Sequence, residues 1–372
     1  MKIAQVCPYD FAHPSGVVNH VSALANNMVK MGHEVRIIAP TSKPVSTFGD
    51  RFMPIGRPWP IPSSGSVARI ALSPWLSRQV RGILDRENFD IIHLHEPLCP
   101  MLCTTVLRLS RTTNIGTFHA VDSRGYSLWK PLTDVFLKKW FTKLDGKIAV
   151  SKPAKEFSSK HFHGDYTIIP NGVDLEHFSP HVSPIDEFSD GKTNILFVGR
   201  MEKRKGLDYL LDAYVRVKEV VPNSRLIIVG PGTRWSKKHE KQCNMKDVHF
   251  IGYASYDDLP RYYKAADIVC APATGRESFG IILLEAMAMG KPIVASNIEG
   301  YASVVTHGGQ GLLVPPRDEE SLAKGIISLV RDETLRHEMG ARGREKVLGY
   351  GWKHVTQRVL DYYIRVLNEH VH

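Results

Sequence analysis

The chain has 372 residues, of which 43% are hydrophobic and 23% are charged, as in ordinary globular proteins. This length exceeds what one hydrophobic core normally serves, so we expect two domains of about 150 to 200 residues each. No apolar run approaches the roughly 20 residues that span a bilayer, and the first residues lack the apolar core of a secretory signal. The sequence therefore predicts a cytoplasmic protein without a membrane span.

Lysine and arginine number 48 against 38 aspartates and glutamates, which gives a formal net charge of +10. This charge favours a polyanionic partner, which could be nucleotide phosphates, an anionic lipid surface or nucleic acid. The cysteines form no CxxC pair and no zinc-spaced cluster, so we expect buried thiols in a reducing compartment. They are Cys7, Cys99, Cys103, Cys243 and Cys270.

Short β-rich apolar runs alternate with helical patterns over most of the chain, which is typical of βα units and parallel sheets. A helix is predicted over Val17 to Met31, because apolar residues recur there at three- and four-residue spacing. The strands expected in the first half are residues 2–7, 34–39, 90–95, 115–119, 147–150 and 166–169. The predicted fold class is therefore α/β.

A polar, proline-containing stretch near residues 179–192 is the clearest linker in the sequence. After it the alternation restarts, with strands expected in NILFVGR, RLIIVG, VHFIG, DIVCAP, PIVAS and GLLVP. The final stretch has helical spacing and no strand after it. We therefore predict a first domain of residues 1–180, a second of residues 181–351, and a terminal helix over residues 352–372 that packs back on the first. Two sheets in succession also predict a cleft between the domains.

The strongest motif is GRESFGIILLEAMAMGKPIVAS, in which Glu277 and Glu285 stand eight positions apart. The loop ends near Phe279, so free N–H groups around Gly280 and Ile281 would face outward at the positive end of the helix dipole. A phosphate fits such a helix start. One glutamate could then bind a sugar hydroxyl and the other a ribose diol. Taken alone, both are equally compatible with ordinary residues near a helix start.

Two further features place ligand-binding groups at strand ends. In NILFVGRMEKRKG, Arg200 directly follows a strand, and Lys205 precedes Gly206 before an amphipathic helix. Open α/β sheets bind ligands at this edge, where the two cations could neutralise a diphosphate leaving group. In the first domain, Gly16 opens the first helix and lets a ligand approach the backbone closely. Both halves therefore offer helix starts suited to phosphate.

Together these motifs resemble those of the family 4 retaining glycosyltransferases of the GT-B fold. The resemblance covers nearly the whole chain and lies in the SGV helix start, GTFH, PNGVD, VGRMEKRKG and ESFGIILLE. The stretches PYDFAHPSGVVNHV, GSVARIALSPWLSRQVRGIL, FDIIHLHEPLCP and GTFHAVDSRGYS are similar to bacterial phosphatidylinositol mannosyltransferases and related lipid glycosyltransferases. The resemblance implies two Rossmann-like, doubly wound domains that face a cleft.

The resemblance also implies catalytic roles for His119, Arg200, Lys205 and Glu277. His119 would lie beside the reacting sugar, whereas its position alone suggests a core histidine. The two cations would stabilise the leaving diphosphate in a front-face displacement, which needs no protein nucleophile. The chain contains no DxD triplet. We therefore expect a hexosyltransferase that uses no metal and no cofactor besides its nucleotide-sugar co-substrate.

The donor-binding residues implied by the resemblance lie in the second domain, with the exception of Gly16. The full set is Gly16, Arg200, Lys205, Gly252, Tyr253, Ser255, Glu277, Phe279, Gly280, Ile281 and Glu285. The loop from Gly252 to Ser255 would receive the nucleobase, but its side chains do not distinguish guanine from uracil. The donor is therefore GDP- or UDP-linked, with mannose from GDP-mannose as the first expectation.

Two basic, aromatic stretches predict peripheral contact with an anionic membrane. Residues 66–86 combine Trp75, Arg78 and Arg81 with aliphatic side chains, and residues 124–143 repeat this mixture. Such a mixture can lie among lipid headgroups, with its apolar side chains inward and its arginines toward phosphates. The alternative is that both stretches are ordinary packed amphipathic helices. The expected location is the inner face of the plasma membrane.

The acceptor-binding residues expected are Tyr9, Arg69 and Arg124. In the lipid mannosyltransferases a glutamine of the first helix touches inositol and a threonine follows the histidine, whereas this chain has Val18 and Ala120. These departures weaken the case for inositol itself. A phosphatidylinositol-like or other glycerolipid acceptor is expected.

Other functional classes fit the sequence less well. An NAD-dependent oxidoreductase needs a GxGxxG turn after a strand, but the first turn reads HPSGVVNH. A P-loop is excluded because Pro292 follows Gly290-Lys291 and Glu285 replaces its first glycine. A basic nucleic-acid-binding protein would explain the charge but gives no role to the paired charges of the second half. A UDP-sugar-dependent transferase with a diacylglycerol-type or soluble acceptor remains the alternative enzyme.

Overall fold

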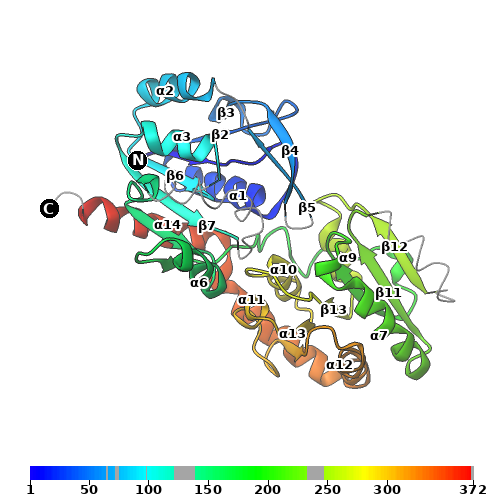
Figure 1. Cartoon of the computed structure of the whole chain (residues 1–372). Helices are drawn as coiled ribbons and strands as arrows, with labels where there is room; N and C mark the ends of the chain where they lie inside the picture. The colour runs from blue at the N-terminus through cyan, green and yellow to red at the C-terminus, as the bar shows by residue number, and fades with distance from the viewer. Residues whose placement is uncertain (64–65, 72–74, 98, 121–138, 233–246, 370–372) are drawn as a thin grey trace. The chain divides into compact units, whose positions relative to one another are not determined.

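The computed structural model describes residues 1–63, 66–71, 75–97, 99–120, 139–232 and 247–369. The chain divides into two compact units, shown with their elements in Figure 1. Unit 1 comprises Met1–Asn171 and Trp352–His372, and unit 2 comprises Gly172–Gly351. Each unit has its own parallel sheet and its own hydrophobic core.

Unit 1 has a seven-stranded sheet in the order β3-β2-β1-β6-β7-β8-β9. Its strands are β1 (Lys2–Val6), β2 (Glu34–Ala39), β3 (Phe52–Pro54), β6 (Ile91–His95), β7 (Thr113–Phe118), β8 (Gly146–Ala149) and β9 (Thr167–Ile168). Its helices are α1 (Gly16–Lys30), α2 (Leu76–Glu87), α3 (Leu102–Leu109), α6 (Lys152–His161) and α14 (Trp352–Glu369), with the 3-10 turn η1 (Gly49–Arg51). A hairpin of β4 (Pro58–Ser63) and β5 (Ser66–Ala71) follows β3.

Unit 2 has a six-stranded sheet in the order β12-β11-β10-β13-β14-β15. Its strands are β10 (Thr193–Val198), β11 (Ser224–Val229), β12 (Val248–Gly252), β13 (Ile268–Ala271), β14 (Ile293–Ser296) and β15 (Gly311–Val314). Its helices are α7 (Leu207–Val220), α9 (Leu259–Ala265), α10 (Ile281–Ala288), α11 (Glu299–Ala302), α12 (Glu319–Arg331) and α13 (Glu333–Val347). Its 3-10 turns are η2 (Asp186–Phe188), η3 (Lys203–Lys205) and η4 (Leu348–Tyr350).

Both main sheets follow the doubly wound strand order of the Rossmann fold. In each, the first strand lies between the second strand and a later one, so the strand order reverses beside β1 in unit 1 and beside β10 in unit 2. The strands predicted from the sequence are all present, with ends displaced by a residue or two. The predicted α/β class and the paired doubly wound domains are confirmed.

The β4–β5 hairpin was not expected from the sequence. Pro58, Pro60 and Pro62 remove backbone donors from β4, and prolines usually exclude a segment from a sheet interior. In a two-stranded hairpin one side of β4 needs no partner, so the prolines are tolerated there. Residues 66–86 are consequently not one amphipathic segment, because they supply strand β5 and then helix α2.

Helices α1 and α14 pack together in the core of unit 1. Helix α1 begins at a Ser15 cap, whose side chain accepts a hydrogen bond from the Val18 N–H at 3.3 Å, and such a cap satisfies one of the free donors of the first turn. Val21, Leu24 and Met28 of its apolar face are buried. At Gly146 an added Cβ would lie 2.8 Å from the Tyr362 ring of α14. The terminal helix therefore belongs to unit 1, as predicted.

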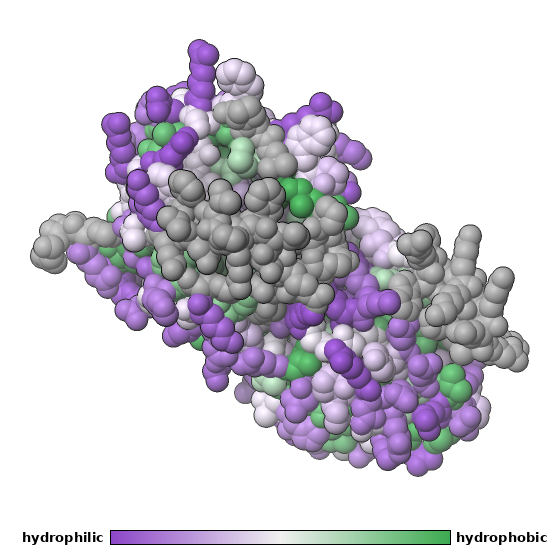
Figure 2. Space-filling view, viewed as in Figure 1, coloured by the Kyte–Doolittle hydropathy of each residue, from purple (hydrophilic) through white to green (hydrophobic). Residues whose placement is uncertain are grey.

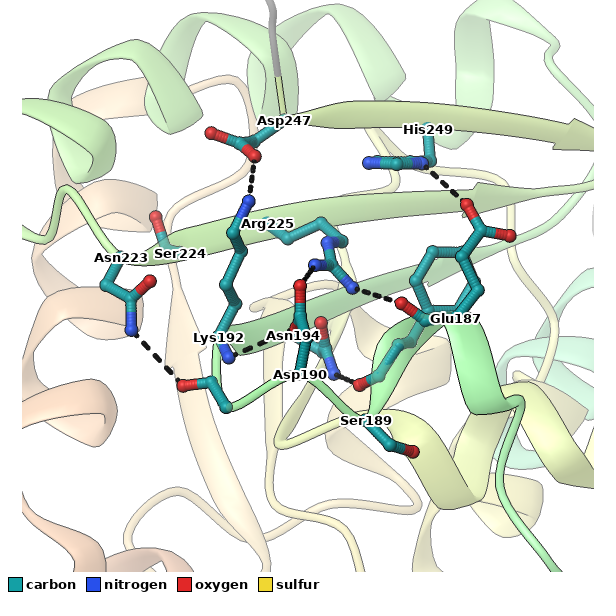
Figure 3. A network of polar contacts seen from close by, with 12 residues as sticks. Glu187, Ser189, Asp190, Lys192, Asn194, Asn223, Ser224, Arg225, Asp247 and His249 are labelled. Carbon is teal, nitrogen blue, oxygen red and sulfur yellow. Dashed lines mark hydrogen bonds and ion pairs between the residues drawn. The ribbon is translucent and has the colours of Figure 1, made fainter.

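The polar stretch expected to be a linker is packed onto unit 2 (Figure 3). Arg225 of β11 forms an ion pair with Asp190 and donates a hydrogen bond to the Glu187 carbonyl at 3.2 Å. The guanidinium also lies 5.1 Å from the ring centre of the buried Phe188. Val173 and Phe178 also pack in the hydrophobic core of unit 2, so this unit begins at Gly172, ahead of the predicted boundary at residue 181.

The described cysteines are free and buried, as expected. They are Cys7, Cys99, Cys103 and Cys270, whereas Cys243 lies outside the described residues. Burial raises the pKa of Cys7 to about 12. Its thiol therefore stays protonated near neutral pH, and a protonated thiol is a poor nucleophile.

Among the described helices, none has both the length and the apolar character needed to cross a bilayer. On the face shown in Figure 2, the residues coloured by hydropathy are mainly hydrophilic, and the hydrophobic ones among them form small, separate patches.

We predict that Asp247→Asn destabilises unit 2. Lys192 and Lys218 both donate hydrogen bonds of 2.6 Å to Asp247 and lower its pKa from 3.8 to about 2. Because the folded-state pKa is the lower one, the stabilisation is present above about pH 4 and disappears as the pH falls through about 2. The expected loss is roughly 1 to 2 kcal/mol.

Thermal unfolding of the wild type and the variant at neutral and acidic pH measures this loss. The variant should unfold at a lower temperature at neutral pH, and the difference should shrink on acidification. Asp257→Asn, which changes an exposed aspartate of the same unit, is the control. Equal midpoints for Asp247→Asn and the wild type at neutral pH would contradict the prediction.

Candidate functional site

The residues predicted to bind a diphosphate gather at one edge of the unit 2 sheet. Arg200 and Lys205 follow strand β10, whereas Glu277 and Gly280 follow the neighbouring strand β13. These two strands flank the point where the strand order reverses, and open α/β sheets bind ligands beyond the carboxyl ends of such strands. The structure therefore brings together two motifs that are far apart in the sequence.

A continuous chain of ion pairs joins the two loops. Arg200 Nη1 lies 2.9 Å from Glu202 Oε1, and Arg204 Nε lies 2.8 Å from the other oxygen of Glu202. Arg204 also pairs with Glu277 Oε1, and Lys205 Nζ lies 2.8 Å from that same oxygen. Three cations face two carboxylates, so the chain keeps a net positive charge that suits an anionic ligand.

Sequence reasoning missed Arg204 and Glu202. The run Lys203-Arg204-Lys205 did signal a basic loop, but the 3-10 turn η3 decides which side chains face Glu277. Lys203 is exposed, whereas Arg204 and Lys205 are partly buried in the ion-pair chain. The backbone of Arg204 is held in place by a hydrogen bond from the Thr274 N–H at 2.8 Å.

The start of helix α10 is open, as the sequence predicts. The loop ends at the buried Phe279, Gly280 takes a left-handed φ of +96°, and no side chain caps the first turn. A Cβ at Gly280 would lie 2.6 Å from the Tyr301 ring, so another residue there would be crowded as well as strained. The Leu283 N–H donates to the Gly280 carbonyl at 3.0 Å, so the N–H groups of Ile281 and Ile282 offer an anion site at the positive end of the helix dipole.

Glu285 lies inside α10 and is held by the neighbouring helix α9. The Tyr263 hydroxyl donates a 2.7 Å hydrogen bond to Glu285 Oε2. Burial raises the pKa of Glu285 to about 7, although this hydrogen bond and the charge of Lys205 oppose the shift. The carboxyl group therefore titrates near neutral pH, and in its ionised form it can accept hydrogen bonds from a diol.

The predicted nucleobase loop begins where β12 ends. Gly252 has a left-handed φ of +76°, and Tyr253 is 70% exposed. Ser255 is engaged with the start of α9, because its hydroxyl donates to Asp258 Oδ2 at 2.7 Å and accepts from the Asp258 N–H at 3.0 Å. Tyr253 is thus the side chain of this loop most open to a ligand.

In unit 1, His119 lies in a buried group of histidines. Its Nε2 is 3.2 Å from His95 Nδ1, and its ring meets the edge of the His20 ring at a centroid distance of 4.8 Å. His93 stacks on His95 at 4.4 Å. Burial lowers the pKa of all four, to about 4 for His20, to about 3 for His93 and well below the ordinary value for the others. The imidazoles are therefore neutral near pH 7.

Sequence reasoning missed three of these histidines, although a signal was present. His93 and His95 are two apart in β6, so they lie on the same face of the strand. His20 lies on the buried face of α1. Within the described residues, His20, His95 and His119 also have the geometry to hold a metal ion, since one ligand nitrogen from each lies within 4.8 Å of the others.

The remaining unit 1 predictions fall near the β4–β5 hairpin and α1. Tyr9 forms an antiparallel bridge with Ile70, next to Arg69, so two expected acceptor residues are neighbours. Gly16 is the first residue of α1, beside the strand-order reversal of the unit 1 sheet. Arg124 lies outside the described residues.

The predicted membrane stretch is corrected in part. Ile70, Leu76 and Val80, which were expected to face lipid, are buried in the core of unit 1. Helix α2 turns its apolar side toward α3 and the sheet, because burial there removes more apolar surface from water. Trp75, at 73% exposed, and the exposed Arg78 and Arg81 remain on the surface.

The second basic stretch, residues 124–143, is described only from residue 139 onward. There Phe141 packs in the core of unit 1, and Lys143 Nζ donates a 2.8 Å hydrogen bond to the Ser110 carbonyl. This described end therefore packs against unit 1, and the rest of the stretch lies outside the described residues.

Comparison with known families divides the chain into two parts, at residues 177–182, within ten residues of the start of unit 2. Residues 14–177 match the model described as Glycosyltransferase Family 4. Residues 182–346 match the model described as Glycosyl transferases group 1. Together the two models cover most of the chain.

The chain is also similar to curated proteins over nearly its whole length. It is 37% identical to the phosphatidyl-myo-inositol mannosyltransferase of Mycobacterium leprae over 98% of this chain and 96% of that protein. Identity to the protein of the same name from Propionibacterium freudenreichii is 33%, over 98% of this chain and 94% of that protein.

Solved structures share the fold at lower identity. Anabaena HepE in complex with UDP has a TM-score of 0.78 and 17% identity, covering 97% of this chain and 99% of that chain. Sucrose-phosphate synthase from Thermosynechococcus elongatus has a TM-score of 0.76 and 21% identity, covering 99% of both chains. This likeness shows the common two-domain architecture.

We predict that Glu285→Gln stabilises the ligand-free protein under alkaline conditions. The folded-state pKa of about 7 exceeds the ordinary 4.5, so wild-type stability is lost as the pH rises from about 4.5 through 7. The amide can still accept the Tyr263 hydrogen bond but carries no charge. Thermal midpoints should therefore be similar near pH 5 and higher for the variant near pH 8.

The exposed Glu299 of the same unit supplies the control, since Glu299→Gln should leave the midpoint unchanged at both pH values. A wild type that gains stability from pH 5 to 8 relative to Glu285→Gln would contradict the raised pKa.

Proposed function

Because the chain belongs to the family 4 glycosyltransferases of the GT-B fold, we propose that it transfers mannose from GDP-mannose to a phosphatidylinositol-like membrane lipid. The transfer would retain the configuration of the sugar. The observation that carries the donor part is the ion-pair chain beside the open start of α10. The acceptor part is supported by the two mannosyltransferase relatives, whose names give phosphatidyl-myo-inositol as their acceptor.

In this proposal unit 2 binds the donor. The N–H groups at the start of α10 bind a phosphate, and Arg200 and Lys205 stabilise the charge that develops on the leaving diphosphate. An ammonium group has three donors, so Lys205 can hold Glu277 and a phosphate oxygen at the same time. Glu277, oriented by Arg204 and Lys205, then accepts hydrogen bonds from hydroxyls of the sugar.

The chemical step would be a front-face displacement. The acceptor oxygen bonds to the anomeric carbon as the bond to the diphosphate breaks, and the acceptor proton passes to the departing phosphate oxygen. The cations lower the energy of this charge separation. His119 would form a hydrogen bond with the sugar. Its neutral imidazole adds no positive charge beside the oxocarbenium-like anomeric centre. No step requires a metal or a protein nucleophile.

The acceptor would meet unit 1 near Tyr9 and Arg69, since Tyr9 forms a bridge with Ile70, the residue that follows Arg69. Val18, at the position of the family glutamine, is buried in α1 and contributes to packing instead. An acceptor that is held mainly by its phosphate and glycerol, rather than by many inositol contacts, fits these residues best.

Peripheral contact with the inner face of the plasma membrane is part of the proposal. Trp75 and Trp59 are 73% and 54% exposed, and Arg78 and Arg81 lie exposed on α2. Exposed aromatic side chains and arginines suit the interface of an anionic bilayer. The apolar side of α2, being buried, would not enter the lipid.

A UDP-linked donor with a diacylglycerol-type or soluble acceptor is the second candidate. HepE, which shares the fold, was solved in complex with UDP. The exposed Tyr253 could stack on either nucleobase, so the described loop does not favour one. A donor screen against extracted lipids and soluble sugars separates the two candidates.

We predict that Lys205→Ala, Glu277→Ala and His119→Ala each lower turnover about a hundredfold or more, because each removes a group expected at the reacting centre. The measurement is the rate of transfer from GDP-mannose to phosphatidylinositol vesicles. Lys203→Ala is a matched control, since Lys203 lies on the same 3-10 turn but is exposed. Wild-type turnover in any test variant would remove that residue from the site.

We also predict that the protein floats with anionic liposomes at low salt and less so at high salt, because headgroup attraction is screened. Arg78→Glu and Trp75→Ser should each reduce the floating fraction. Lys353→Glu changes an exposed charge on α14 of the same unit and should float like the wild type. Failure of the wild type to float at low salt would favour the soluble acceptor.

A further inference from the structure

Gln5 of β1 is a fully buried amide that joins two hydrogen-bond chains. Its Oε1 lies 2.8 Å from His95 Nε2, and its Nε2 lies 3.3 Å from both Tyr363 Oη and Met28 Sδ. A buried polar group that lacks partners would be costly. The partners of Gln5 therefore determine which atom donates and which accepts in each of its hydrogen bonds.

The direction of the first chain follows from the chemistry of its atoms. A thioether sulfur only accepts hydrogen bonds, so the side of Gln5 that faces Met28 must be the amino group. The carbonyl oxygen then faces His95, whose Nε2 must carry the hydrogen. His95 Nδ1 is left with a lone pair.

The same reasoning fixes His119. Its Nε2 lies 3.2 Å from the lone pair of His95 Nδ1, so this nitrogen must carry the hydrogen and donate it. The backbone N–H of His119 is held at 2.7 Å by Glu96 Oε1. His119 is therefore the Nε2–H tautomer, with its Nδ1 as a hydrogen-bond acceptor. Within the described part of the chain, no hydrogen-bond partner faces this Nδ1.

The second chain leads away from His119. The Tyr363 hydroxyl accepts from Gln5 and donates to His93 Nδ1 at 2.6 Å, and His93 Nε2 donates to Thr117 Oγ1 at 2.6 Å. This branch ends on strand β7 without a hydrogen bond to the His119 ring. It provides an internal comparison, because it is equally buried but lies outside the chain that sets the His119 tautomer.

We propose that Gln5 and His95 are positioning residues for transfer, which hold His119 as its Nε2–H tautomer and keep Nδ1 as an acceptor for a sugar hydroxyl. The inference rests on the role proposed above for His119. A neutral acceptor nitrogen can take a hydrogen bond from the sugar and places no proton charge near the positive anomeric centre. With the opposite tautomer, Nδ1 would present an N–H group and lose this interaction.

A metal ion is the competing use of the cluster. A tetrahedral zinc with bonds of about 2.0 to 2.1 Å needs ligand nitrogens roughly 3.3 Å apart. The 3.2 Å pair of His95 and His119 meets this spacing, but a proton already bridges it in the derived network. Zinc would have to displace that proton and draw in His20, since the ligand atoms spread up to 4.8 Å. The hydrogen-bond chain fits the observed geometry without such a change.

The test compares variants that keep or remove the acceptor at His95. His95→Asn can place its amide oxygen near the former Nδ1, whereas His95→Leu offers no acceptor. Gln5→Met removes the amide, which frees His95 to change tautomer. We expect His95→Leu and Gln5→Met to lower kcat about tenfold or more, with the KM for the nucleotide-sugar unchanged. His95→Asn should recover most of this loss, and Thr117→Val, which breaks the other branch, should keep near-wild-type kcat.

Long-range proton–nitrogen NMR of protein labelled at histidine reports the tautomer directly. We expect His119 to be the Nε2–H form in the wild type and in Thr117→Val, and to lose this preference in Gln5→Met. An Nδ1–H tautomer in the wild type, wild-type kcat in Gln5→Met, or equal loss in folded His95→Asn and His95→Leu would each overturn the proposal.

Two further outcomes distinguish this proposal from the proposed role of His119, and a third distinguishes it from metal binding. If His119→Ala retains wild-type turnover, the role of His119 fails, and the positioning role fails with it even where NMR finds the expected tautomer. If NMR finds the expected tautomer and only Gln5→Met keeps full turnover, the positioning role alone fails. Stoichiometric zinc binding that His20→Ala abolishes would assign the cluster to a metal and overturn the proposal.

Discussion

The proposed donor site of unit 2 depends on the close approach of the loops that follow β10 and β13. At Gly206 an added Cβ would lie 1.8 Å from the Pro272 carbonyl oxygen, and the residue has a left-handed φ of +73°. Only glycine satisfies both conditions. This contact lets Thr274 bind the Arg204 backbone, which places Arg204 and Lys205 on Glu277.

The electrostatics of the site follow from this geometry. The carboxylate of Glu277 forms ion pairs with Arg204 and Lys205. Glu285 instead accepts a hydrogen bond from Tyr263, and burial raises its pKa to about 7. Two glutamates of one motif therefore have different electrostatic surroundings.

Unit 1 uses burial in another way. Its histidines are kept neutral, and their hydrogens are placed by an amide and a tyrosine rather than by charges. Tyr363 comes from the terminal helix α14, so the last helix of the chain completes a network that begins on the first strand. The packing of α14 on unit 1 is thus linked to the arrangement of the polar cluster as well as to the hydrophobic core.

The sequence by itself determined the α/β class, the strands of both main sheets except β3, the open start of α10 and the charged groups after β10 and β13, because each depends on local periodicity, glycine conformation or spacing. Only the tertiary structure decided that residues 179–192 pack on unit 2, that Ile70 and Leu76 face the core, and that Arg204 pairs with Glu277. It also decided that His20, His93 and His95 surround His119. These features join residues distant along the chain, and such contacts depend on which sheet faces meet and which polar groups burial forces to pair.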